Sequence, residues 1–198
     1  MEQRIISPRT MRETARGIAL TSIYDEMLSR RELSVTGAID AAMAFDICQQ
    51  LLQLERDDAS AEVTLYVTSP GGSVSAGLAI VDAMRTIACP VRTVCLDTAA
   101  SMGAIIFVSG DRREMFPHAE LMIHDPLIQN AGGSALSVQE TSRRLMGLRR
   151  TLSQILADRS GLTVKRVQAL TAKDTFLTAE RAVELGFADA IVTSRKAA

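Results

Sequence analysis

Two periodicities of apolar positions alternate along the first half of the chain. Residues Val63-Thr64-Leu65-Tyr66-Val67-Thr68 alternate apolar and polar side chains, which predicts a strand. A shorter alternation at Leu33-Ser34-Val35 predicts another strand that ends at Gly37. Between them, apolar residues recur at helical spacing from Ala41 to Glu55. The pattern therefore predicts a strand–helix–strand unit.

The unit is repeated directly afterwards. Ser69-Pro70-Gly71-Gly72 breaks the strand, Val74 to Ile87 has helical periodicity, and Pro90 closes it. Val91 to Leu96 then has the apolar character of a buried strand. Two strand–turn–helix units in succession, followed by a third strand, imply parallel strands joined by right-handed crossovers. The expected fold class is α/β.

The second half of the chain has shorter strands and one long helix. Met102 to Val108 is apolar over about two helical turns, and Met115-Phe116 and Leu121-Met122-Ile123 predict short strands. A flexible linker is expected over 129–135, followed by the longest helix, about Leu136 to Asp158. This helix has an apolar stripe with no obvious sheet partner nearby in sequence, so it packs either on another subunit or on its own domain.

The remaining elements lie at the two ends. Residues 1–17 lack sustained periodicity and are expected to form a mobile arm, and residues 18–198 a single domain that begins with a helix over Ile18 to Leu28. Thr163 and Thr178 are the expected N-caps of two short helices, the second of which ends at Gly186. Ala190-Ile191-Val192 predicts a closing strand.

Composition narrows the class of protein. The 198 residues, 47% hydrophobic and 23% charged, are enough for one folded domain with a real core. The formal net charge is −1, so the chain lacks the excess of positive charge that favours nucleic-acid binding, and we expect no nucleic-acid partner. The chain has neither a membrane-spanning run nor a signal-peptide pattern, so we expect a cytoplasmic location and no membrane partner. Cys48, Cys89 and Cys95 lie within apolar patterns and are expected to be reduced core residues.

Candidate chemistry gathers around Ser101. It stands between the strand of residues 91–96 and the helix of residues 102–108, where helix amide groups favour a developing negative charge on a nearby oxygen. The chain has only two histidines, His118 and His124, and His124 follows the predicted strand of residues 121–123. Asp174 lies in a turn between two helices. Ser101, His124 and Asp174 could therefore supply a nucleophile, a base and its orienting carboxylate in chain order. The alternative is that Ser101 merely caps a helix.

A glycine pair offers a second indication. Gly71-Gly72 follows a strand, where the absence of side chains lets backbone amides approach a ligand closely. The alternative is an ordinary turn before the helix that begins at Val74. No nucleotide, phosphate or metal motif is present, so no cofactor is expected in this chain.

Four motifs in order resemble the signature of the ClpP family, the proteolytic subunits of the ATP-dependent Clp proteases, and the similarity runs from about residue 13 to residue 192. The motifs are Ser69-Pro70-Gly71-Gly72-Ser73-Val74, Ala99-Ala100-Ser101-Met102-Gly103-Ala104, Met122-Ile123-His124 and Lys173-Asp174-Thr175-Phe176-Leu177.

The resemblance implies a crotonase-like α/β fold of repeated β-β-α units with a projecting handle helix at about residues 136–158. It also implies a tetradecamer of two stacked heptameric rings. It makes Ser101 the nucleophile, His124 the general base and Asp174 its orienter, with the amides of Gly72 and Met102 as the oxyanion hole. Polypeptide substrates would be delivered by a AAA+ unfoldase of the ClpX or ClpA type, which uses the ATP.

The chain departs from the family pattern in several places, among them an interval from Ser101 to His124 that is two residues shorter than usual and a more polar stretch at Glu32-Leu33-Ser34-Val35. Ala172-Lys173 replaces an Asp-Arg pair that helps to couple the rings, and Thr64 replaces one of two tyrosines at the pocket that docks the unfoldase. These departures indicate a divergent paralogue, which could work beside a second ClpP. Two alternatives to the peptidase remain: a weakly active or inactive structural or regulatory ring subunit paired with an active paralogue, and acyl-CoA chemistry on the crotonase fold.

Overall fold

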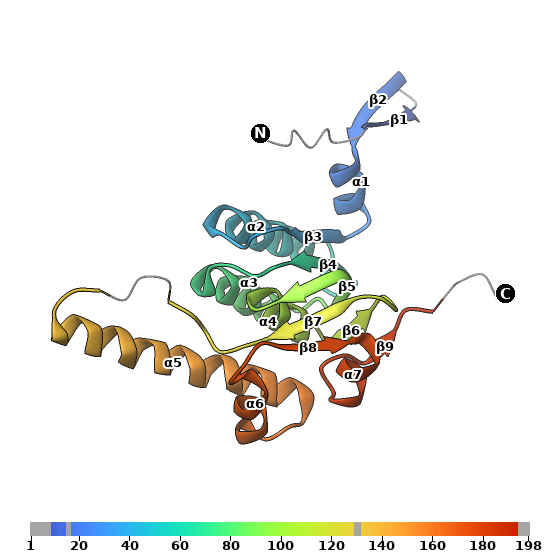
Figure 1. Ribbon diagram of the computed structural model, residues 1–198. Helices are drawn as coiled ribbons and strands as arrows, with labels where there is room; N and C mark the ends of the chain where they lie inside the picture. Colours follow the sequence, from blue (N-terminus) through green and yellow to red (C-terminus); the bar gives the residue numbers. More distant parts are fainter. Residues whose placement is uncertain (1–8, 15–16, 129–131, 194–198) are drawn as a thin grey trace, which may run out of the picture.

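The computed structural model describes residues 9–14, 17–128 and 132–193, and its central feature is a mostly parallel sheet (Figure 1). Strands β3, β4, β5, β6 and β9 are neighbours in that order, and β7 continues the sheet beside the end of β5 and pairs antiparallel with β8. The bounds of the seven strands are β3 (Glu32–Thr36), β4 (Val63–Ser69), β5 (Val91–Ala100), β6 (Arg112–Met115), β7 (Glu120–Ile123), β8 (Thr175–Thr178) and β9 (Ala190–Ile191).

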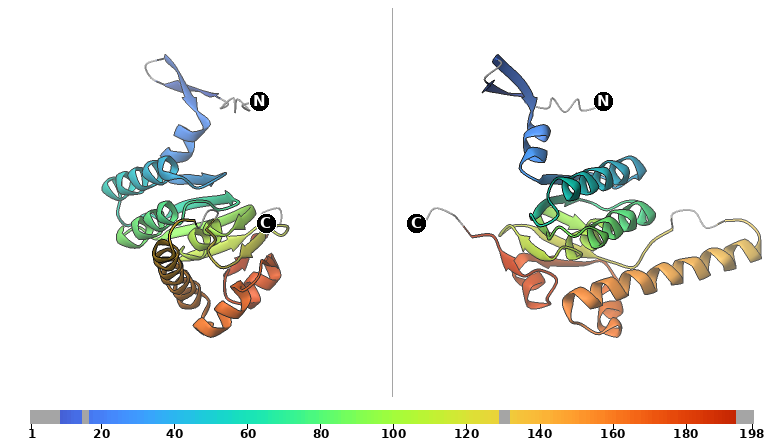
Figure 2. Two further views of the ribbon diagram at one scale, coloured as in Figure 1. Left: turned by 60° about the vertical axis from the view of Figure 1, so that its left-hand side comes forward. Right: turned by 180° about the vertical axis from the view of Figure 1, so that it is seen from behind.

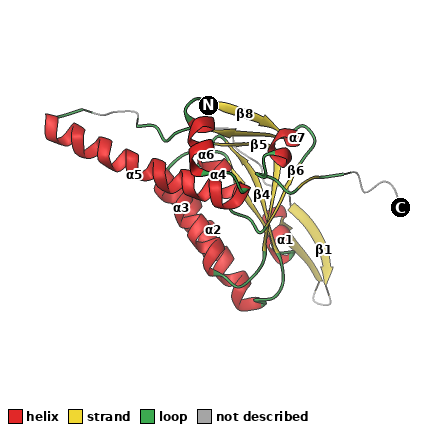
Figure 3. Cartoon of the chain, turned by 90° about the horizontal axis from the view of Figure 1, so that it is seen from below, coloured by secondary structure: helices red, strands yellow, loops and turns green. Residues whose placement is uncertain are grey.

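The two predicted strand–helix–strand units are confirmed. β3 pairs with β4 and β4 with β5, both in parallel. The connections contain α2 (Ala41–Asp57) and α3 (Val74–Thr86), which pack against each other and lie on one side of the sheet (Figure 3). Strand β4 buries alternate residues, and three of them, Val63, Leu65 and Val67, are fully inaccessible to solvent. The α/β fold class follows from these parallel pairings.

Strand β5 is longer than its sequence predicts and changes partner along its length. Its first part, Arg92 to Cys95, pairs with β6, and its last part, Thr98 to Ala100, pairs with β7. The register with β4 shifts between Val67 and Ser69. The polar residue Asp97 interrupts the apolar pattern there, which is why the prediction stopped at Leu96. The extension brings the strand to the residue directly before Ser101.

The N-terminal part differs from the sequence-based expectation. β1 (Arg9–Thr14) and β2 (Gly17–Ser22) form an antiparallel hairpin that stands apart from the main sheet (Figure 1). The helix predicted from residue 18 therefore begins only at residue 23, as α1 (Ile23–Ser29). Ser22 sets this boundary, because its side chain and that of Asp25 form a reciprocal capping box. Residues 1–8 and 15–16 of the predicted arm lie outside the described residues, and its mobility stays a prediction.

The predicted long helix is confirmed as α5 (Ala135–Ser160), which projects well beyond the sheet (Figure 2). Its C-terminal part packs on its own domain, where Leu152, Ile155 and Leu156 are buried. Its N-terminal part leaves Leu136 77% exposed and Met146 46% exposed. The linker predicted before it lies partly outside the described residues, at 129–131. Within the described part of the chain, no helix has the length and apolarity that a membrane crossing requires.

The remaining short helices pack on the sheet or on α5. They are α4 (Met102–Val108), α6 (Val164–Thr171) and α7 (Ala179–Glu184). Helix α4 is buried at every residue. Thr163 and Thr178 accept hydrogen bonds from the amides of Arg166 and Arg181, which confirms both predicted N-caps.

Candidate active site

Ser101 has a strained backbone, with φ 54° and ψ −116°. Among the non-glycine residues that the structure describes, only Arg31 shares a positive φ. Such a conformation costs on the order of 1–3 kcal/mol and persists only where the surroundings impose it. The neighbouring sheet imposes it here, because Ser101 directly follows β5 and its amide donates a hydrogen bond to the Met122 carbonyl at 2.8 Å.

The side chain of Ser101 does not cap α4, although the residue holds the N-cap position. Its Oγ lies 2.8 Å from Nε2 of His124 instead. The capping alternative is therefore wrong for this serine. If Ser101 donates to Nε2, a neutral imidazole carries its proton on Nδ1.

His124 and Asp174 face each other because of the pairing between β7 and β8. The antiparallel register sets Ile123 opposite Thr175, so the next pair outward is His124 and Asp174. Nδ1 of His124 lies 3.5 Å from Oδ1 of Asp174. The histidine side chain is 13% exposed and the aspartate side chain is 64% exposed. The three predicted side chains thus meet at the ends of three strands, whereas His118 lies in the exposed turn between β6 and β7.

The two glycines before α3 are closely packed, Gly71 against Ser101 and Gly72 against Ile39. A Cβ atom added to Gly71 would lie 2.7 Å from Cβ of Ser101, and one added to Gly72 would lie 2.3 Å from the carbonyl oxygen of Ile39. Both residues have positive φ, of 99° and 152°. The reading of this pair as an ordinary turn is therefore incomplete, because the backbone here is in close contact with the serine.

The bridge between Ile39 and Gly72 orients the Gly72 amide. Ile39 donates to the Gly71 carbonyl and accepts from the Ser73 amide, at 2.9 and 2.8 Å. In a parallel bridge of this kind the enclosed residue directs its own amide to the opposite side. The Met102 amide is the first of α4 and has no carbonyl of its own helix to bind. Both residues line the same cavity as Ser101.

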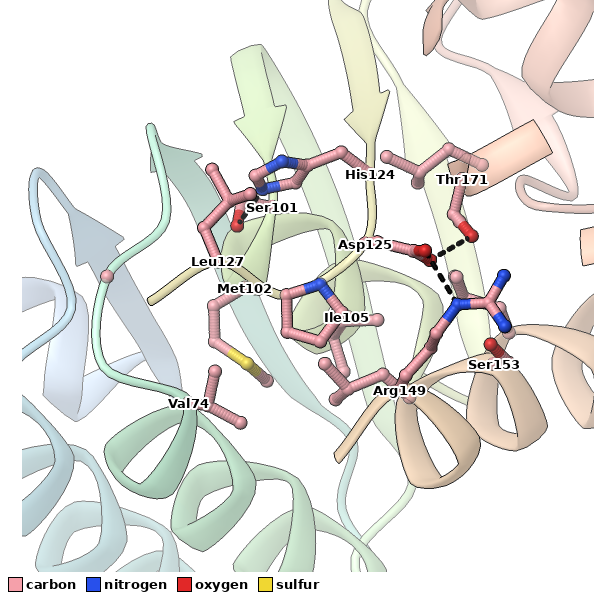
Figure 4. A pocket seen from close by; sticks show the side chains of 15 residues that line it. Val74, Ser101, Met102, Ile105, His124, Asp125, Leu127, Arg149, Ser153 and Thr171 are labelled. Carbon is pink, nitrogen blue, oxygen red and sulfur yellow. Dashed lines mark hydrogen bonds and ion pairs between the residues drawn. The ribbon is translucent and has the colours of Figure 1, made fainter. Parts of the chain in front are cut away.

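That cavity has a volume of about 420 Å³ and opens beside Ser101 and His124 (Figure 4). Its apolar lining comes from α3, α4, α5, the last residue of β7 and the segment that follows it. The apolar residues are Val74, Met102, Ile105, Ile123, Pro126, Leu127, Leu152 and Leu156. The polar residues besides Ser101 and His124 are Asp125, Arg149, Ser153 and Thr171. A cavity of this kind accepts a mainly apolar group and orients it with its few polar side chains.

The sequence did not indicate that three of these residues, Asp125, Arg149 and Thr171, belong to the site. The Asp125 carboxylate accepts a hydrogen bond from Nε of Arg149 at 2.6 Å and one from Oγ1 of Thr171 at 2.7 Å. Asp125 directly follows His124, and that adjacency was the only signal in the sequence. The pairing itself depends on α5 and α6, which only the fold brings beside β7.

The parallel sheet, its helical layer and the polar groups at its strand ends define a mixed α/β protein with a strand-end site. Comparison with known proteins narrows this class. The family model described as Clp protease matches residues 15–195, and the chain belongs to the Clp protease family.

Two curated relatives have nearly the same length as this chain. A protein of Streptococcus gordonii is 41% identical over 194 residues, which cover 94% of this chain and 97% of the relative. One of Streptococcus suis is 41% identical over 196 residues, which cover 96% and 98%. Both are named ATP-dependent Clp protease proteolytic subunit. The resemblance carried by the four motifs is therefore confirmed at the level of the family.

Proposed function

We propose that the chain is a serine endopeptidase subunit of a Clp-type compartmentalised protease. The observation that carries this proposal is the 2.8 Å separation between Oγ of Ser101 and Nε2 of His124, beside a largely apolar cavity. A hydroxyl at hydrogen-bond distance from a neutral imidazole is the arrangement that nucleophilic catalysis requires. The roles of nucleophile, general base and orienting carboxylate then belong to Ser101, His124 and Asp174.

The reaction proceeds in two halves. Oγ of Ser101 attacks the scissile carbonyl carbon while Nε2 of His124 accepts its proton. The tetrahedral intermediate collapses when the C–N bond breaks and the imidazolium returns the proton to the leaving amine. Water then attacks the acyl-enzyme with His124 again as base, which releases the second product and regenerates the serine. Asp174 stabilises the imidazolium that forms in each half.

The amides of Gly72 and Met102 form the oxyanion hole in this proposal. They come from two different elements, and both residues line the cavity that contains Ser101. The bridge to Ile39 and the start of α4 leave these two amides available to a ligand. A pair of such donors stabilises the developing charge by several kcal/mol, since removing one typically costs about 10²–10³ in kcat.

The family and the names of the relatives support a wider role in protein degradation. We propose that the chain assembles into stacked heptameric rings in the cytoplasm. An ATP-using AAA+ unfoldase of the ClpX or ClpA type would deliver polypeptide substrates to them. The chain itself would use no cofactor. The exposed apolar residues of α5, Leu136 and Met146 among them, support self-association.

Covalent labelling of the purified protein tests the proposal. A fluorophosphonate probe is expected to modify Ser101 alone, and a fluorogenic peptide is expected to be hydrolysed without ATP. Ser101→Ala should lose both reactions while it sediments as the same particle. If the wild-type protein takes up no probe but joins particles of an active ClpP, it is a structural or regulatory ring subunit. Full hydrolysis by Ser101→Ala would refute the mechanism.

A further inference from the structure

The Asp125 carboxylate links the end of β7 to both α5 and α6. It lies between β7 and the loop that leads to α5, directly after His124. Its Oδ2 accepts from Nε of Arg149 on α5 at 2.6 Å, and its Oδ1 accepts from Oγ1 of Thr171 on α6 at 2.7 Å. Figure 4 shows the carboxylate between these two side chains. Both of its oxygen atoms are therefore engaged.

The backbone strengthens the link to α6. The Asp125 amide donates to the Thr171 carbonyl at 2.8 Å, so side chain and main chain both join these two residues. Thr171 is 3% exposed and is the last residue of α6, three positions before Asp174. The two links consequently fix the segment that carries His124 against the segment that carries Asp174.

The link to α5 is sheltered from solvent. The Arg149 side chain is 24% exposed and that of Asp125 is 33% exposed, and both line the cavity. Sheltered ion pairs with a short hydrogen bond hold geometry more firmly than surface pairs do. The position of α5 is thereby coupled to the strand end that carries His124.

We propose that Asp125, held by Arg149 and Thr171, is a positioning residue that keeps His124 aligned between Ser101 and Asp174. It does not touch the reacting atoms, and it acts through the backbone of β7. This inference rests on the proposed peptidase function. It means that activity requires more than the three predicted site residues. The contact between α5 and the end of β7 must also be intact.

Variants at each partner test the inference. Asp125→Asn and Arg149→Met are expected to lower kcat for a fluorogenic peptide by about 10- to 100-fold, with KM changed less than about threefold, because a small displacement of a catalytic group costs this much. Arg149→Lys should retain more activity than Arg149→Met. Thr171→Val tests the link to α6 independently of α5. The double variant Asp125→Asn/Arg149→Met should lose little more than either single variant, since both break the same contact.

The two single variants change charge in opposite directions. A positioning role predicts that both lower kcat, whereas a through-space effect of charge on His124 predicts opposite changes. Asp158→Asn is the matched control, because this exposed carboxylate of α5 accepts a hydrogen bond from Gln154 of the same helix. It should leave kcat unchanged.

The assembled particles are first isolated by size-exclusion chromatography. Their activity is then divided by the number of serines that the fluorophosphonate probe labels when the labelling reaction is complete. A wild-type protein without labelling or hydrolysis refutes the proposed function. An active wild-type protein whose Asp125→Asn and Thr171→Val variants keep full kcat per labelled site refutes this inference alone.

Discussion

Nδ1 of His124 lies 3.5 Å from Oδ1 of Asp174, and 64% of the surface of that aspartate side chain is exposed to solvent. The distance allows an ion pair once the imidazole is protonated and is longer than a normal hydrogen bond. Water competes with an exposed carboxylate for such an interaction. In the proposed mechanism, Asp174 is therefore expected to contribute less than the buried aspartate of a tightly closed triad.

We expect Asp174→Asn to lower kcat for peptide hydrolysis by about 10²- to 10³-fold, below the roughly 10⁴-fold that a buried triad aspartate supports. The loss arises because a neutral amide does not stabilise the imidazolium as a carboxylate does and can favour the wrong tautomer. Steady-state hydrolysis of a fluorogenic peptide measures it. Unchanged kcat in an assembled Asp174→Asn particle would remove this residue from the mechanism.

Gly71→Ala is expected to reduce activity by more than about 100-fold. The new methyl group would lie 2.7 Å from Cβ of Ser101, so the serine must move away from His124. Gly37→Ala is the matched control, since Gly37 also has a positive φ, of 84°, but open space around its missing Cβ. It should cost about 1 kcal/mol of stability and leave kcat intact. Equal kinetic losses in the two variants would show that backbone strain, and not contact with Ser101, is responsible.

Thiol reactivity should follow burial. Burial raises the pKa of Cys95 to about 12, and its residue is fully inaccessible. Burial and the charge of Asp82 also raise the pKa of Cys48, but that residue is only half-buried. Because the thiolate is the reactive species, iodoacetamide at pH 8 should modify Cys48 first and Cys95 only on unfolding. Peptide mass spectrometry over time measures the order, and rapid native labelling of Cys95 would contradict it.

The Arg113–Asp189 pair should make stability depend on pH. Burial raises the pKa of Asp189, but hydrogen bonds from the Arg113 side chain and backbone outweigh it, so the net pKa is lowered. A lowered folded-state pKa contributes stability above the unfolded value of about 3.9, and this contribution is lost as the pH falls through the folded value.

Asp189→Asn should therefore lower Tm by a few degrees at pH 7, since it leaves the largely buried Arg113 without its counter-charge, and solvent screening of the 40% exposed carboxylate limits the loss to about 1 kcal/mol. The difference from wild type should shrink below pH 4. Glu184→Gln, which breaks the exposed pair with Arg181, should change Tm by less than about one degree. A constant difference across the pH range would rule out this linkage.

Local pattern predicted most of the architecture correctly. The alternation at Val63 to Thr68, the helical spacing of α2 and α3, and the N-caps at Thr163 and Thr178 each depend on residues close together in sequence. The hairpin of β1 and β2 was missed because apolar and polar residues alternate only weakly there, and the strands are recognised only from their pairing with each other. The partner change along β5 was missed for the same reason, since two different strands meet it.

For the site, the sequence alone determined the residue types and the motifs that carry the family resemblance, including Ser101, His124 and Asp174. Tertiary structure decided that they meet, because the register of β5, β7 and β8 brings three strand ends together. It also decided the role of Asp125, whose partners Arg149 and Thr171 lie 24 and 46 residues away along the chain. Contacts of that range depend on how sheet and helices pack, and no local periodicity records such packing.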